Sequence, residues 1–314
     1  MSGPGFRAIG GASWIFLMSA AAATLTAPTS SAQPKVAEAI VPAGRYYVGQ
    51  VFGPQNYRAH ANVAVAGFSV MRTDVTYALY REVSAWGAAH GYNPFDVCSD
   101  CDGVPNGGKL PVNGISWLGA VVFANAMSEM IGLDPVYRDG RGAAIRNIDN
   151  RVEMETACVA EHAPGYRLPT YAEWQIAARG ADRGLANGTY GNPHSGGWRP
   201  PVRDHMPEGK EGDPRPSVVG RNRPNALGVY DMSGNLADWT ATPYDLGEGP
   251  DGHHKQFLFC GETFAHGADM TLASCDFHSS SFADGDLGFR LVRWTPVVAG
   301  SGRTMHPPKA PAAP

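Results

Sequence analysis

The sequence predicts an α+β fold, arranged as a single loop-rich domain with few regular elements. Segments typical of short strands and segments with helical spacing follow one another without alternating as βαβ units. The 39 glycines and 25 prolines among 314 residues indicate long stretches of turn and loop. The chain shows no tandem period, which argues against a solenoid or a propeller.

Short strands and two helices are predicted in the first half of the chain. Residues 41–80 alternate apolar and polar side chains between turn residues, as half-buried strands do. The segment 74–92 changes to helical spacing, and its apolar face is formed by Val75, Leu79, Val83 and Trp86. A second helix is predicted from Ser116 to Gly132, with an apolar stripe of Trp117, Val121, Ala124 and Met127.

A third helix has the clearest start signal in the sequence. Thr170 and Glu173 have the spacing of a capping box, in which each side chain satisfies a backbone N–H of the first turn. Arg179 stands near the predicted end of this helix, where a positive charge complements the helix dipole.

Both ends of the chain are predicted to lie outside the domain, which we place at 36–296. Residues 1–32 are typical of an export signal, because Arg7 precedes an apolar stretch and small residues precede a cleavage point near Ala32. A membrane anchor is the competing interpretation, but glycines and serines dilute this short stretch. Residues 297–314 are rich in proline and alanine and are predicted to be a disordered tail.

These features predict a bacterial protein that is periplasmic or secreted, with no stable membrane span once the signal is cleaved. The formal net charge of -4 and the lack of a basic run exclude an electrostatic footprint for nucleic acid. An exported protein can form disulfides, and the closest cysteines in sequence, Cys98 and Cys101, are predicted to form a local structural one.

Six separated stretches resemble, in the same order, the formylglycine-generating enzyme family, whose members are also called sulfatase-modifying factors. The stretches are VPAGRYYVG at 41–49, DVTYALY at 74–80, PVNGISWLGAVVFANAM at 111–127, GYRLPTYAEWQIAARG at 165–180, NALGVYDMSGNLADW at 225–239 and GDLGFRLVR at 285–293. The resemblance implies a single α+β domain related to C-type lectins.

Most residues of these stretches are predicted to have structural roles. Arg167 and Arg290 are expected to order carbonyls and carboxylates of the core, because one guanidinium satisfies several acceptors. Glu173 is expected to cap its helix, and Trp174 and Trp239 are expected to be core aromatics.

The resemblance also implies a structural calcium site. In the family, backbone carbonyls and an acidic side chain of a Gly-Asn turn bind the ion, and Gly234, Leu236 and Asp238 stand at those positions here. A polar turn capped by Asp238, without an ion, is the alternative.

The family's catalytic cysteine pair is absent. Formylglycine-generating enzymes oxidise a cysteine of a target peptide at a Cu(I) ion held by two thiolates. The expected ligand positions fall near Ala265 and Met270. A methionine can bind Cu(I) but is more often a core residue.

The remaining candidates for catalysis or redox metal binding are Cys260, Cys275, His266 and His278. The two cysteines could meet across a hairpin and hold copper, or they could form a disulfide. Imidazole binds copper, zinc or iron, although histidines in loops are usually solvated.

Two functions follow from these observations. The first is an exported oxidative tailoring or maturation factor for a peptide or periplasmic protein, similar to tailoring enzymes of siderophore maturation and not an orthodox sulfatase activator. The second is a non-catalytic accessory or binding module on the lectin-like scaffold, for example one linked to a periplasmic copper nitrite reductase.

Overall fold

The structure is a computed structural model of the 314-residue chain. It describes residues 34–48, 60–93, 95–98, 107–148, 158–159, 163–181, 215–221, 223–244, 255–264 and 275–295, all within the unit Pro34–Pro314. The predicted signal 1–32 and tail 297–314 lie outside the described residues, and their boundaries stay predictions. Within the described ranges, no helix has the length and apolar character needed to cross a membrane.

A three-stranded antiparallel sheet joins the two ends of the domain. Strands β1 (Glu38–Val41) and β11 (Val292–Trp294) pair with opposite edges of β4 (Phe68–Met71). Arg293 donates from Nε and Nη2 to the Glu38 carboxylate at 2.8 and 2.7 Å, so an ion pair accompanies the strand pairing.

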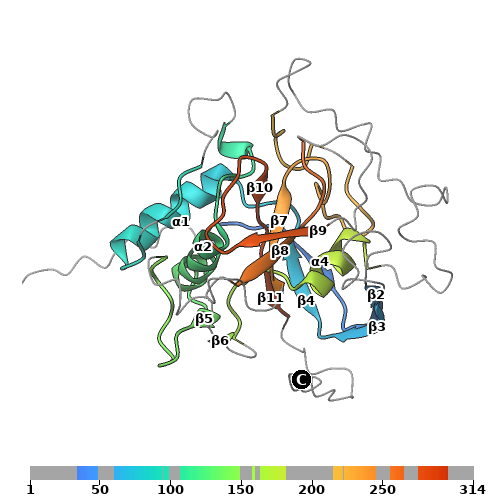
Figure 1. The fold of residues 1–314 in the computed structure, drawn as a ribbon, viewed down its shortest axis with the longest axis horizontal. Helices are drawn as coiled ribbons and strands as arrows, with labels where there is room; N and C mark the ends of the chain where they lie inside the picture. The colour runs from blue at the N-terminus through green and yellow to red at the C-terminus, as the bar shows by residue number, and fades with distance from the viewer. Residues whose placement is uncertain are drawn as a thin grey trace, which may run out of the picture. The chain divides into compact units, whose positions relative to one another are not determined.

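A four-stranded sheet, in the order β10-β7-β8-β9, lies at the centre of the described fold (Figure 1). It consists of β7 (Ala237–Tyr244), β8 (Gln256–Cys260), β9 (Cys275–Ser279) and β10 (Leu287–Gly288). Strand β10 runs parallel to β7, and the other pairs are antiparallel.

The remaining elements are short. Strands β2 (Gly44–Val48) and β3 (His60–Val65) form one antiparallel pair, and β5 (Tyr137–Arg138) and β6 (Cys158–Val159) form another. A 3-10 turn, η2, covers Gly107–Lys109.

All three predicted helices are present. Helix α1 (Tyr77–Ala89) begins after Thr76, whose hydroxyl accepts from the Leu79 N–H, and α2 (Trp117–Met130) begins after Ser116 in the same way. Residues 117–128 of α2 are all buried, so this helix is enclosed on every side where the sequence predicted a single stripe. Helix α4 (Tyr171–Ala178) carries the predicted capping box of Thr170 and Glu173.

The four-stranded sheet is covered on both faces. Strand residues alternate between the faces. Phe257 and Trp239 belong to the apolar cluster around α2, where the Phe257 and Trp117 rings stack with centroids 3.7 Å apart. Leu258 and Cys260 belong to the cluster around α4. The described elements therefore form one loop-rich α+β domain, as the sequence predicted.

Candidate functional site

The face of the sheet beneath α4 carries a disulfide. Cys260 ends β8 and Cys275 begins β9, and the two residues are directly opposite in the antiparallel register. Their sulfur atoms are bonded to each other. Of the two arrangements that the sequence left open for these cysteines, the structure has the disulfide.

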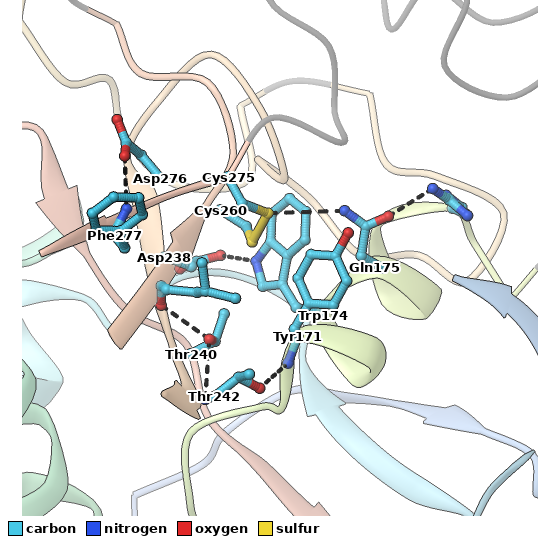
Figure 2. The surroundings of a disulfide bond; sticks show 12 residues. Tyr171, Trp174, Gln175, Asp238, Thr240, Thr242, Cys260, Cys275, Asp276 and Phe277 are labelled. Atoms are coloured by element: carbon cyan, nitrogen blue, oxygen red, sulfur yellow. Dashed lines mark hydrogen bonds between the residues drawn. A yellow bond between two sulfur atoms is a disulfide. The ribbon is translucent and has the colours of Figure 1, made fainter. Parts of the chain in front are cut away.

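Asp238, Cys260 and Cys275 form a row across three neighbouring strands. Asp238 of β7 is opposite Cys260, and Cys260 is opposite Cys275. Residues directly opposite each other in adjacent strands present their side chains on the same face. Figure 2 shows the row covered by Trp174 and Gln175 of α4. These five residues are called the disulfide face below.

Two polar contacts connect α4 to this row. Trp174 Nε1 donates to Asp238 Oδ2 at 2.8 Å, and Gln175 Nε2 donates to Cys275 Sγ at 3.9 Å (Figure 2). Gly261, directly after Cys260, has a φ of 108°, and a Cβ there would lie 3.3 Å from Trp174 Cζ2. A glycine is therefore required where the chain leaves β8 beside the Trp174 ring.

Asp238 of the disulfide face also belongs to a buried charge cluster. Arg290, fully buried, donates from Nε to Asp238 Oδ2 at 2.7 Å and from Nη2 to Asp74 Oδ1. Asp74 and Asp238 each keep one buried oxygen that accepts no hydrogen bond from a protein donor. Burial, together with the charges of Asp238 and Asp231, raises the pKa of Asp74 well above its usual range, although Arg290 opposes this shift. A hydrogen bond between the two acids also contributes to this shift, and only a protonated Asp74 could donate it to Asp238.

A second buried ion pair fixes the start of α4. Arg167 donates to both carboxylate oxygens of Glu173, at 2.7 and 2.6 Å, and Glu173 also accepts from the Thr170 N–H at 2.8 Å. Burial acts to raise the pKa of Glu173, but the Arg167 charge and these hydrogen bonds hold it below its usual value.

Trp239, predicted to be a core aromatic, is fully buried and donates from Nε1 to the Ile115 carbonyl at 2.9 Å.

The predicted His/Cys metal site is not assembled by the described residues. The disulfide consumes both thiols, so neither Cys260 nor Cys275 offers the thiolate that Cu(I) prefers. His278 lies on the opposite face of β9 from Cys275, where its ring stacks on Phe282 with centroids 3.5 Å apart. His266 lies outside the described residues. In the part of the chain that the structure describes, no three His, Cys, Asp or Glu side chains form a group that could hold a metal.

Oδ2 of Asp238 does not fit the role of calcium ligand. This oxygen accepts from both Trp174 and Arg290, and a guanidinium in direct contact would repel a divalent cation. Gly234 has a φ of 86° and donates its N–H to the Glu262 carbonyl at 2.7 Å. Whether the carbonyls of Gly234 and Leu236 bind an ion stays a prediction.

Cys98 is disulfide-bonded, and its sulfur accepts from the Asn113 N–H at 3.5 Å. Its predicted partner Cys101 lies outside the described residues, so that pairing stays a prediction.

Sequence reasoning missed Asp74 and Gln175. Asp74 precedes α1 in a stretch that indicated a helix and the family, but no role for its carboxylate. Its partner Arg290 is 216 residues away in the sequence. Gln175 is buried in α4 between Trp174 and Ile176. A polar residue between two apolar residues of a predicted helix was the signal in the sequence that could have marked it as a buried polar group.

The two-sided sheet, the capped helix α4 and the buried Arg290 pairs define a formylglycine-generating-enzyme-like domain of the C-type lectin type. The model of the sulfatase-modifying factor enzyme 1-like domain matches residues 24–295, and the chain belongs to this family.

The chain is similar over most of its length to three proteins of known name. It is 30% identical over 242 residues to the chaperone protein LppX of Paenibacillus barcinonensis, covering 72% of this chain and 79% of that protein. It is 29% identical over 228 residues to the formylglycine-generating enzyme of Mycobacterium tuberculosis, covering 65% and 73%. The crystal structure of CarF is similar with a TM-score of 0.69 and 38% identity, over 84% of this chain and 100% of that one.

Proposed function

We propose that this protein is an exported maturation or accessory factor that binds a peptide or another exported protein, and that it does not perform copper-dependent cysteine oxidation. The Cys260–Cys275 disulfide carries this proposal. The pair sits in the segment where the family's copper cysteines are expected, and its sulfurs are bonded to each other.

The relatives support a role in maturation. LppX is named a chaperone protein, and it is similar over most of both chains. The residues near Ala265 and Met270 are not cysteines, whereas copper-dependent family members need a thiolate pair there. The predicted export signal at 1–32 supports a periplasmic or secreted location, and a client would then be exported as well.

Site-specific photo-crosslinking of the full chain in its native host tests the proposal. One variant carries the crosslinking residue at Asp276, which is exposed on β9, and the control carries it at Glu82, which is exposed on α1. We expect one exported protein or peptide to be captured, saturably, from position 276 and not from position 82.

The catalytic alternative is tested on the same purified protein. It is incubated with a cysteine-containing peptide, copper and oxygen, and the peptide is analysed by mass spectrometry. Conversion of the cysteine to formylglycine would overturn the proposal, as would equal capture from both crosslinking positions.

A further inference from the structure

We propose that the Cys260–Cys275 disulfide is a thiol-exchange site, at which an external thiolate attacks Cys275 and Cys260 is the leaving sulfur. The proposal goes beyond the proposed function, because a client can be bound without any exchange.

The two cysteines differ in exposure. Cys260 is fully buried within the α4 cluster, whereas Cys275 is partly exposed at the start of β9. An exchange reaction needs a nucleophile to reach one sulfur. The exposed part of the pair is thus Cys275, and we assign the attack to its sulfur.

A buried amide is aimed at the same sulfur. Gln175, only 1% exposed, accepts at Oε1 from Arg179 Nη2 at 2.6 Å and donates from Nε2 to Cys275 Sγ at 3.9 Å. A guanidinium only donates hydrogen bonds, so Arg179 fixes the amide with its oxygen outward and its N–H groups toward the sulfur. A donor held in this way acts in the second step of the exchange, when Cys275 leaves as a thiolate, because it stabilises the negative charge on that sulfur.

The fold does not depend on this bond for its sheet. Strands β8 and β9 are paired over five residues each, from the pair of Gln256 with Ser279 to the pair of Cys260 with Cys275. A reduced Cys260 would remain buried as a small apolar side chain. The reduced protein is thus expected to keep its fold, which a reversible exchange site requires.

The exchange transfers two electrons from external thiols to the protein disulfide in two steps. The external thiolate bonds to Cys275, the Cys260–Cys275 bond breaks, and Cys260 leaves with the electron pair and takes up the proton that the attacking thiol gave up. A second thiol then displaces Cys275 as a thiolate. Two external thiols become a disulfide, and the protein disulfide becomes two thiols.

Glutathione is the probe for the first test. The full-length oxidised protein is incubated with reduced glutathione, quenched with acid and alkylated, and the modified peptides are mapped by mass. We expect glutathione on Cys275 and an alkylated Cys260 while circular dichroism still reports a folded protein. A disulfide that resists thiols until the protein unfolds, or glutathione on Cys260, would overturn the proposal.

Two single variants provide a matched comparison. Cys260→Ser leaves only the partly exposed Cys275 and should accumulate the mixed disulfide when treated with oxidised glutathione. Cys275→Ser leaves only the buried sulfur and should not. Equal labelling of the two variants would contradict the assignment, and the wild-type mapping above decides the matter if either variant fails to fold.

Gln175 is a positioning residue in this proposal and can be tested separately. In the Cys260→Ser background, Gln175→Leu removes the donor, and alkylation of Cys275 at neutral pH should slow about fivefold, the loss expected for one hydrogen bond. Gln175→Glu keeps the Arg179 contact but places an acceptor against the sulfur, so it should be slower than Gln175→Leu. A purely structural role would make Gln175→Glu the milder change.

Discussion

Asp238 and Arg290, 52 residues apart in the sequence, form a buried ion pair with 2.7 Å between Oδ2 and Nε. The same guanidinium binds Asp74 and the Tyr230 carbonyl, and the same carboxylate oxygen accepts from Trp174 of α4. One charge pair therefore connects the four-stranded sheet, α4 and the segment ahead of α1. Its energetics decide how the domain responds to substitution and to pH.

Arg290→Met should destabilise the protein strongly. Removing one partner of a buried pair leaves the other charge uncompensated, which costs about 3–5 kcal/mol. Arg293→Met is the matched control, because Arg293 also pairs with an acid but is 31% exposed. We expect the control to cost less than about 1 kcal/mol. Urea unfolding of both variants measures the difference, and equal losses would show that burial does not govern the cost.

Asp74→Asn should be tolerated and should change how the stability depends on pH. A group whose pKa is raised by folding stabilises the fold at low pH and loses that contribution as pH rises through its folded pKa. The wild type should therefore lose stability as pH rises above the ordinary aspartate range, and part of that loss should be absent in Asp74→Asn, whose amide mimics the protonated acid. Thermal unfolding from pH 4 upward checks this, and the same slope in the wild type and in Asp74→Asn would count against a raised Asp74 pKa.

Glu173→Gln should remove part of the acid sensitivity. The folded pKa of Glu173 is lowered by Arg167 and by the capping hydrogen bonds, so its contribution is present at neutral pH and is lost as pH falls through the folded value. The variant should be less stable at pH 7, by about 2 kcal/mol for a weakened buried pair and cap. Its unfolding free energy should depend less on pH between 3 and 6 than that of the wild type.

Copper binding should depend on the redox state of the disulfide. The oxidised protein offers no Cys260 or Cys275 thiolate, so we expect weak Cu(I) binding in competition with a chromophoric chelator. Titration of the same sample after mild reduction is the internal comparison. Tight binding by the oxidised protein would point to ligands other than these two sulfurs.

Calcium should contribute little through Asp238, because Arg290 and Trp174 occupy its bonded oxygen. The melting temperature with excess calcium should match that with a chelator to within about 2 °C, less than the shift produced by 1 kcal/mol in a domain of this size. A larger increase with calcium would assign the ion to the carbonyls of the 234–238 turn.

The elements with local signals were predictable from the sequence. The Thr170–Glu173 capping box marked the start of α4 because both partners lie within one helical turn. The position of helix α2 was predicted correctly, but its burial on every side was not. Val122 and Ala126 lie outside the predicted stripe and are also apolar, so the helix has no polar face opposite the stripe. The order of predicted strands and helices indicated the α+β class, the family resemblance added the relation to C-type lectins, and the structure and the relatives confirm the fold.

The arrangement of the site could not be predicted, because it depends on contacts between distant segments. The spacing of Cys260 and Cys275 permitted either a metal pair or a disulfide, and only the register of β8 and β9 places them opposite each other. Nothing in the stretch around Asp238 indicates that Arg290 lies against it, so the ion pair could not be weighed when Asp238 was predicted to bind calcium.

The pairing of β1 and β11 on opposite edges of β4 has a consequence for biogenesis. The sheet that contains β1 lacks its third strand until β11 is available, so this sheet is completed only when the chain is present as far as Trp294. Contacts between such distant segments form late and slowly. If the chain crosses a membrane in the unfolded state, this topology delays folding until translocation is almost finished.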